Sequence, residues 1–191
     1  MPKQGKIFII SGPSGSGKTT LYRKLLHSKR LKGRIVKAIS VTTRKKREGE
    51  AHGRDYYFVS KKMFLHKQKS GQFLEHENVF GNLYGTPQGP VFGHVSSGKS
   101  VILCIDVKGA RTVRRKIVNV ISIFIRTRTL KELKERLNNR GSESRTKLAE
   151  RLKTAKAELK EAPAYDYIVI NDKISTALRR LEQIIRKEIK D

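Results

Sequence analysis

A glycine-rich segment near the start of the chain has the residue types that bind nucleotide phosphates. Residues 12–19 read Gly-Pro-Ser-Gly-Ser-Gly-Lys-Thr, which matches the pattern G-x-x-x-x-G-K-[ST] at every fixed position. Glycines are needed because successive backbone N–H groups must turn toward phosphate oxygens, in conformations that a Cβ would obstruct. Lys18 adds a mobile positive charge for the β and γ phosphates, and the Thr19 hydroxyl can ligate Mg²⁺. The segment follows an apolar run and precedes a helical pattern, which is the setting that a P-loop requires.

A second group of residues could bind a nucleoside monophosphate. Arg44 and Arg47 flank a turn, where two guanidinium groups could hold one phosphate dianion. Tyr56 and Tyr84 could each donate a phenolic hydroxyl to the same phosphate. The carboxylate of Glu75 accepts two hydrogen bonds, and guanine offers adjacent N–H donors at N1 and N2, whereas adenine does not. This group therefore indicates a pocket with a preference for guanine.

Short apolar runs alternate with helical patterns along most of the chain. Runs rich in Val and Ile occur at residues 6–11, 35–40, 101–105, 120–125 and 167–170, and helical patterns at 19–29, 107–116, 129–139, 145–161 and 175–190. This alternation predicts an α/β fold with a parallel sheet covered by helices. Residues 41–86 break the rhythm with short strands at 56–59 and 73–79 around a helix. Residues 126–162 break it by being helical only.

The motifs resemble those of the guanylate kinase family in order and spacing, over the whole chain. The resemblance is carried by Ser40-Val-Thr-Thr-Arg44, Gly53-Arg-Asp-Tyr56, Phe73-Leu-Glu75, Gly81-Asn-Leu-Tyr84-Gly85-Thr86, Val101-Ile-Leu-Cys-Ile-Asp106, Arg136 to Gly141 with Arg151, and Tyr167-Ile-Val-Ile-Asn171-Asp172. It implies one domain with the fold of a P-loop nucleotide kinase. The parallel core would hold residues 1–37, 91–125 and 163–191, the GMP-binding lobe residues 38–90, and the helical lid residues 126–162.

The resemblance also implies an activity and a set of site residues. The activity is transfer of the γ-phosphoryl group of Mg-ATP to GMP or dGMP, which gives ADP and GDP in purine nucleotide metabolism and GMP recycling. The implied ATP-binding residues are Gly12, Pro13, Ser14, Gly15, Ser16, Gly17, Lys18, Thr19, Thr20 and Asn171, with Asn171 at the adenine. The implied GMP-binding residues are Ser40, Arg44, Arg47, Glu50, Tyr56, Glu75, Tyr84, Thr86 and Asp106. The implied catalytic residues are Lys18, Arg44, Arg136, Arg140 and Arg151, and Mg²⁺ would be held by Thr19 and Asp106, partly through water.

One position departs from the family pattern beside the implied metal site. The run that ends in Asp106 has the form of an apolar strand followed by an acid, which is associated with Mg²⁺ in P-loop proteins. Relatives usually carry a second acid two residues earlier, where this chain has Cys104. Because side chains alternate along a strand, Cys104 and Asp106 should share one face. Asp106 is then the only carboxylate at that place.

The charge of the chain is strongly positive, with 43 Lys and Arg residues against 17 Asp and Glu, a net charge of +26. This charge predicts anionic partners but does not identify them. A solubilising surface, attraction of nucleotide phosphates and contact with nucleic acid all remain open, although no nucleic-acid-binding motif supports the last. No apolar stretch approaches the roughly 18 residues of a membrane span, and Cys104 is the only cysteine. We expect a cytoplasmic protein without disulfides.

Three alternatives to a GMP kinase fit the sequence less well. A ribose-bisphosphate phosphokinase would share the P-loop, but it would leave Ser40, Glu75 and Tyr84 without a purpose. A guanylate-kinase-like interaction module without catalysis would not need an intact P-loop and lid arginines. A nucleic-acid-binding protein is supported only by the charge. The sequence leaves open whether the protein is a monomer or a homo-oligomer.

Overall fold

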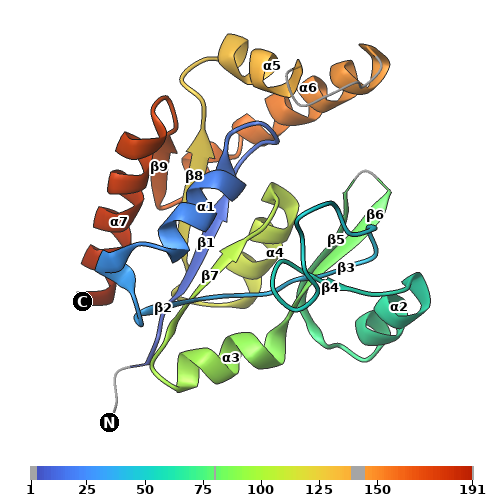
Figure 1. Cartoon of the computed structure of the whole chain (residues 1–191), viewed down its shortest axis with the longest axis vertical. Coiled ribbons are helices and arrows are strands. Elements are labelled where there is room, and N and C mark those ends of the chain that lie inside the picture. The colour runs from blue at the N-terminus through green and yellow to red at the C-terminus, as the bar shows by residue number, and fades with distance from the viewer. Residues whose placement is uncertain (1–3, 80, 139–144, 191) are drawn as a thin grey trace.

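Five short apolar strands form a parallel sheet at the centre of the molecule (Figure 1). They are β1 (Ile7–Ser11), β2 (Ile35–Lys37), β7 (Ser100–Cys104), β8 (Ile121–Arg126) and β9 (Tyr167–Ile170). Their order is β2-β7-β1-β8-β9, and every neighbouring pair is parallel. The structure is a computed structural model that describes residues 4–79, 81–138 and 145–190. Since β1 is the central strand, the loop after it lies between the carboxyl ends of β7 and β8.

Helices cover both faces of this core sheet. The side chains of Phe8 and Ile10 pack on one face with α1 and α7, and those of Ile7 and Ile9 pack on the other with α3 and α4. The four helices are α1 (Lys18–Leu26), α3 (Gln88–Ser96), α4 (Val107–Lys116) and α7 (Ile174–Lys190). Two short 3-10 helices, η1 (Lys29–Leu31) and η2 (Ala162–Ala164), complete these layers. The alternation along β1 thus gives the sheet two buried faces, as a parallel sheet requires.

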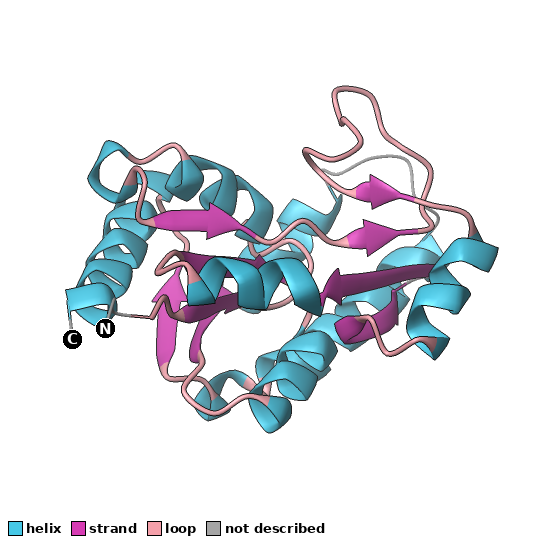
Figure 2. Cartoon of the chain, turned by 90° about the horizontal axis from the view of Figure 1, so that it is seen from below, coloured by secondary structure: helices cyan, strands magenta, loops and turns pink. Residues whose placement is uncertain are grey.

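A second, mixed sheet lies beside the core and at the opposite end of the molecule from the end of α7 (Figure 2). Its strands are β3 (Val41–Thr42), β4 (Tyr57–Phe58), β5 (Phe73–Val79) and β6 (Asn82–Pro87), in the order β4-β3-β6-β5. Helix α2 (Lys61–Lys69) packs on this sheet through Phe64, which stacks on Phe73. The Ser60 hydroxyl caps α2 by accepting a hydrogen bond from the Met63 N–H at 3.2 Å.

Two further helices, α5 (Leu130–Asn138) and α6 (Arg145–Leu159), project beyond the carboxyl edge of the core sheet. They form a small apolar core of their own around Leu133, Leu137 and Ala155. The same two leucines touch the loop that follows β1. A Cβ added to Gly15 would lie 3.1 Å from side-chain carbons of both. The helical segment therefore rests directly on the P-loop.

The prediction of an α/β fold with a parallel core sheet is confirmed. The strand predicted at 56–59 is shorter, and β3 and β6 were not predicted. Residues 82–87 read Asn-Leu-Tyr-Gly-Thr-Pro, which contains poor strand formers, and they become a strand through antiparallel pairing with β5. Within the described residues, no helix is long and apolar enough to cross a membrane.

Candidate active site

The P-loop wraps tightly around the carboxyl end of β1. Gly12, Gly15 and Gly17 have φ angles of 138°, 84° and 87°, which side-chain-bearing residues rarely adopt. A Cβ on Gly12 would lie 2.1 Å from the backbone oxygen of Ile125. The glycines of the motif are therefore required both by backbone conformation and by the close approach of β8. Pro13, Ser14 and Ser16 occupy the remaining positions of the loop, which is largely buried.

The amino end of helix α1 faces outward at the end of this loop. Gly17 precedes the helix and supplies no capping side chain, so the first N–H groups of α1 are left for a ligand. The hydroxyl-bearing residues Thr19 and Thr20 are exposed there. The Lys18 ammonium reaches back over the loop and donates to the carbonyl oxygens of Gly12 at 2.5 Å and Pro13 at 2.9 Å. Unsatisfied N–H groups and a nearby ammonium are the features that an anion-binding site requires.

Three of the predicted guanine-binding residues form one hydrogen-bonded line on the second sheet. Glu75 and Thr86 are cross-strand partners in the antiparallel pair β5–β6. The Thr86 hydroxyl donates to Glu75 Oε1 at 2.5 Å, and the Ser40 hydroxyl lies 3.4 Å from the Thr86 hydroxyl. Because the only hydroxyl hydrogen of Thr86 is donated to Glu75, the Ser40 hydroxyl is the donor in its contact with Thr86. The strand register thus brings together residues that are far apart in the sequence.

Glu75 is only 3% exposed and lies against the core. A Cβ on Gly109, in the first turn of α4, would lie 2.6 Å from Glu75 Oε2. Burial raises the pKa of the Glu75 carboxyl to about 7, although the Thr86 hydroxyl lowers it in part. The contact with Gly109 also places these three side chains beside the carboxyl end of β7, the strand next to β1.

The residues predicted to bind the acceptor phosphate form a second cluster. The Arg44 guanidinium pairs with both oxygens of Glu50, at 2.8 and 3.0 Å, and donates from Nε to the Tyr84 hydroxyl at 3.2 Å. It also lies over the Tyr56 ring, 5.6 Å from the centroid. Burial opposes ionisation of Glu50, but hydrogen bonds from Arg44 and the Arg47 N–H outweigh it and lower the Glu50 pKa. Glu50 thus orients Arg44, while the Arg47 side chain is exposed.

Cys104 is the last residue of β7, and Asp106 follows two residues later, directly before α4. Asp106 caps helix α4, since its Oδ1 accepts a hydrogen bond from the Gly109 N–H at 2.8 Å. Burial raises the pKa of the Cys104 thiol, and the nearby charges of Lys18 and Lys37 lower it only in part. Cys104 is therefore a neutral thiol at physiological pH.

The structure describes two of the three arginines predicted for the lid. Arg136, on α5, donates from Nη2 to the backbone oxygen of Asn171 at 2.8 Å, and its Nη1 would lie 3.9 Å from a Cβ on Gly17. Arg151 lies half-buried on α6. Arg140 lies outside the described residues. The Asn171 side chain, expected at the adenine, is buried and donates to the backbone oxygen of Ser16 at 2.8 Å.

Glu158 lies near the P-loop and was not predicted from the sequence as a site residue. Glu158, in the last turn of α6, has a carboxyl group whose pKa is raised by burial and lowered in part by Lys18 and the Ser14 N–H. An isolated Glu on a charged helix gives no sequence signal. Only the packing of α6 over the core brings this group to the loop.

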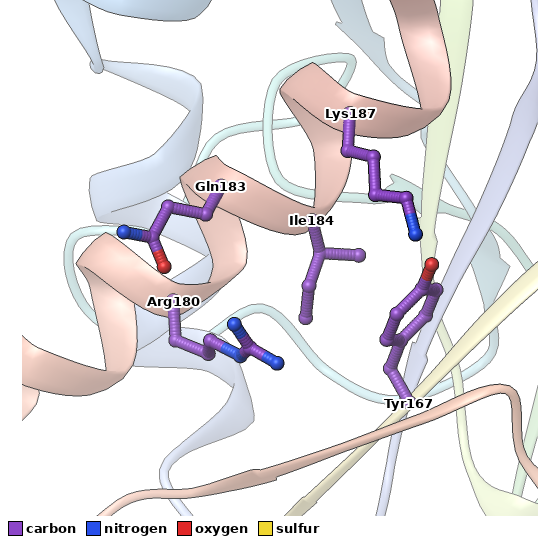
Figure 3. Close-up of a pocket in the computed structure, with 5 residues that line it drawn as sticks. All are labelled: Tyr167, Arg180, Gln183, Ile184 and Lys187. Carbon is purple, nitrogen blue, oxygen red and sulfur yellow. The ribbon is translucent and has the colours of Figure 1, made fainter. Parts of the chain in front are cut away.

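A cavity elsewhere in the molecule does not belong to this site (Figure 3). It lies between the edge strand β9 and helix α7, and its lining residues are Tyr167, Arg180, Gln183, Ile184 and Lys187. The Tyr167 hydroxyl beside it donates to Glu188, which pairs with Lys6 at 3.8 Å. Lys6 precedes β1, so this cavity lies toward the amino end of that strand, away from the P-loop.

The P-loop and the polar cluster of Ser40, Glu75 and Thr86 meet at one edge of a parallel core sheet, and helix α5 contacts the loop. This arrangement defines the class of P-loop nucleotide kinases. Within that class, the chain belongs to the guanylate kinase family, whose family model, described as "Guanylate kinase", matches residues 4–188.

Individual relatives are similar over nearly their full length. A guanylate kinase of Syntrophomonas wolfei is 43% identical over 188 residues, which cover 98% of this chain and 95% of that protein. One of Thermotoga maritima is 40% identical over 185 residues, 97% of this chain and 88% of that protein. The crystal structure of guanylate kinase from Anaplasma phagocytophilum superposes with a TM-score of 0.81 at 36% identity, and covers 99% of this chain and 88% of that chain.

Proposed function

We propose that the protein is an ATP:GMP phosphotransferase that transfers the γ-phosphoryl group of ATP to GMP and releases ADP and GDP. The observation that carries the proposal is the buried Glu75 carboxylate, which is flanked by Thr86 and Ser40 on the sheet that meets the P-loop edge. A carboxylate held in this way accepts from the N1 and N2 hydrogens of guanine. The membership in the guanylate kinase family supports the same reaction.

On the donor side, the P-loop N–H groups, the amino end of α1 and Lys18 would hold the ATP phosphates. Arg136 and Arg151 on the lid, together with Arg140, would neutralise charge on the phosphoryl group during transfer. On the acceptor side, Arg44, Arg47, Tyr56 and Tyr84 would bind the GMP phosphate. The Tyr84 hydroxyl accepts from Arg44, so its own hydrogen remains available for a phosphate oxygen.

This chemistry requires positioning and charge stabilisation rather than a general base. A phosphate oxygen of GMP is already nucleophilic at neutral pH. The residues therefore serve to align two polyanions and to exclude water from the γ-phosphoryl group. The contact of Leu133 and Leu137 with Gly15 supports this role, because it brings helix α5 against the loop.

Mg²⁺ would accompany the ATP phosphates. The exposed Thr19 hydroxyl lies at the start of α1, next to Lys18, where it fits a metal that is held mainly by phosphate oxygens and water. Asp106 fits less completely, because its Oδ1 caps α4. When bound, the metal would neutralise charge that develops on the phosphates.

We also propose the division into lobes that the sequence predicted, with residues 38–90 as the GMP-binding lobe and 126–162 as the lid. The second sheet and α5–α6 lie within these ranges, which supports the division. A cytoplasmic location would give the enzyme access to both nucleotides. The use of dGMP belongs to the same proposal, because none of the contacts assigned to GMP is made to its 2′-hydroxyl.

The test is ADP production from Mg-ATP with a panel of acceptors. The panel contains GMP, dGMP, AMP, CMP, UMP and ribose bisphosphate. We expect turnover with GMP and dGMP and little with the others. Preferred turnover of ribose bisphosphate or of a pyrimidine monophosphate would contradict the proposal, and so would a protein that binds GMP but forms no ADP.

A further inference from the structure

The side chain of Asn171 faces the P-loop and is closed off from solvent. Asn171 directly follows β9 and is 2% exposed. Its Nδ2 donates to the Ser16 carbonyl oxygen at 2.8 Å. Its Oδ1 is buried as well and has no hydrogen-bond partner among the described residues. Both polar atoms of the amide are therefore out of reach of an adenine base arriving from solvent.

The hydrogen bond to Ser16 fixes the orientation of the peptide group that joins Ser16 to Gly17. In a planar trans peptide, the C=O and the following N–H point in opposite directions. Since the Ser16 carbonyl points toward Asn171, the Gly17 N–H must point to the other side. A P-loop binds phosphate through N–H groups that turn toward a common centre, so the direction of this one matters.

The close approach of Asn171 also depends on Gly17 being a glycine. Gly17 has a φ angle of +87°, and a Cβ there would lie 2.2 Å from Asn171 Nδ2. The amide thus occupies the space where a side chain would stand. The last glycine of the motif and Asn171 form one packed unit directly before Lys18.

The main chain of Asn171 connects this unit to the lid. Its carbonyl oxygen accepts a hydrogen bond from Arg136 Nη2 at 2.8 Å, and its N–H donates to the Arg126 oxygen at the end of β8, also at 2.8 Å. One residue therefore links the end of β8, the lid helix α5 and the P-loop.

We propose that Asn171 is a positioning residue for phosphate binding rather than an adenine contact. Its amide holds the Ser16–Gly17 peptide so that the Gly17 N–H faces the ATP phosphates, and its carbonyl holds Arg136 beside them. This inference rests on the proposed function, since it assigns a role within ATP binding. It predicts that loss of the amide weakens the binding of any polyphosphate, whatever base it carries.

The experiment compares Asn171→Asp, which keeps the shape but removes the donor, with Asn171→Ala. The control is Asp172→Asn, in the same turn, whose carboxylate is exposed and pairs with Arg128. Two ligands are titrated by calorimetry, ATP and inorganic tripolyphosphate, and specificity constants are measured for ATP, GTP and CTP as donors to GMP. Thermal melting checks that each variant is folded.

We expect each Asn171 variant to bind ATP roughly 10- to 100-fold more weakly than the wild type. Its affinity for tripolyphosphate should fall by the same factor as its affinity for ATP. The donor preferences should stay unchanged, as should the KM for GMP and all values of the control. Loss of ATP binding with normal tripolyphosphate binding would overturn the inference in favour of an adenine contact. Normal binding of both, or no tripolyphosphate binding by the wild type, would also overturn it.

The binding readout separates this inference from the proposed function. If the wild type fails to phosphorylate GMP, the proposed function is wrong. The tripolyphosphate titrations still decide whether Asn171 positions the loop.

Discussion

At the residue scale, burial and base recognition make opposite demands on Glu75. Burial raises its pKa to about 7, whereas two hydrogen bonds from guanine require the ionised carboxylate. Protonated Glu75 would present a hydroxyl to one of the guanine donors. Since the proton must leave before GMP binds fully, GMP binding should favour higher pH.

We therefore expect kcat/KM for GMP to rise as the pH increases through about 7 and then to level off. The Glu75→Gln variant should lose this step, because its amide does not titrate. Initial rates measured between about pH 5.5 and 8.5 provide the profile. The same step persisting in Glu75→Gln would assign it to another group.

Glu75→Gln should also narrow the preference for GMP over AMP. The new amide places a donor opposite a guanine donor, so one hydrogen bond is lost and a buried donor stays unpaired, which costs about 1 to 3 kcal/mol. GMP use should fall by roughly 10- to 100-fold, whereas AMP, with an acceptor at N1, should lose less. The specificity constants of both acceptors measure this. An unchanged ratio would move base recognition to Ser40 and Thr86.

At the element scale, the P-loop helix is tied to the acceptor side by a turn. Asp55, directly before Tyr56, accepts hydrogen bonds from Arg23 on α1 at 3.3 Å and from the Ala51 N–H at 2.9 Å. The Lys37 ammonium, at the end of β2, donates to the backbone oxygens of residues 54 and 55 at 2.6 and 3.1 Å. These contacts fix the position of Tyr56 relative to α1.

A matched pair of arginines tests this connection. The side chains of Arg23 and Asp55 are 60% and 12% exposed. Those of Arg30 and Glu182, which form an ion pair between η1 and α7, are 61% and 11% exposed. Exposed ion pairs contribute about 1 kcal/mol or less, so Arg23→Ala should raise the KM for GMP by about two- to fivefold. Arg30→Ala should leave it unchanged. Equal effects of the two variants would show that the contact with Asp55 does not position the acceptor site.

The elements also show what could be predicted from the sequence and what could not. Residues 12–19 and the apolar run before them follow local rules, so the P-loop and its strand were predicted. The partnership of Glu75 with Thr86 depends on the pairing of β5 with β6, and β6 has no strand pattern of its own. The orientation of the Asn171 side chain depends on its hydrogen bond to the backbone oxygen of Ser16, which lies 155 positions away in the chain. Contacts of this kind are set by tertiary packing.

At the scale of the whole molecule, a net charge of +26 should act on both substrates, which are polyanions. Salt screens such a field over about 8 to 10 Å at moderate ionic strength. We expect kcat/KM for GMP and for ATP to fall severalfold as salt increases, while kcat at saturating substrate changes much less. Steady-state kinetics in a salt series measure both quantities. Specificity constants that do not depend on salt would show that the charge has no part in substrate capture.

We infer that the P-loop and the second sheet serve one transfer reaction. To test this, the protein is incubated with ATP that carries a label in its γ-phosphate, with and without GMP. The nucleotides are then separated from inorganic phosphate, and the label is measured in each. We expect the label to appear in GDP when GMP is present, and little inorganic phosphate to form when GMP is absent. Label released mainly as inorganic phosphate, or release that does not depend on GMP, would contradict it.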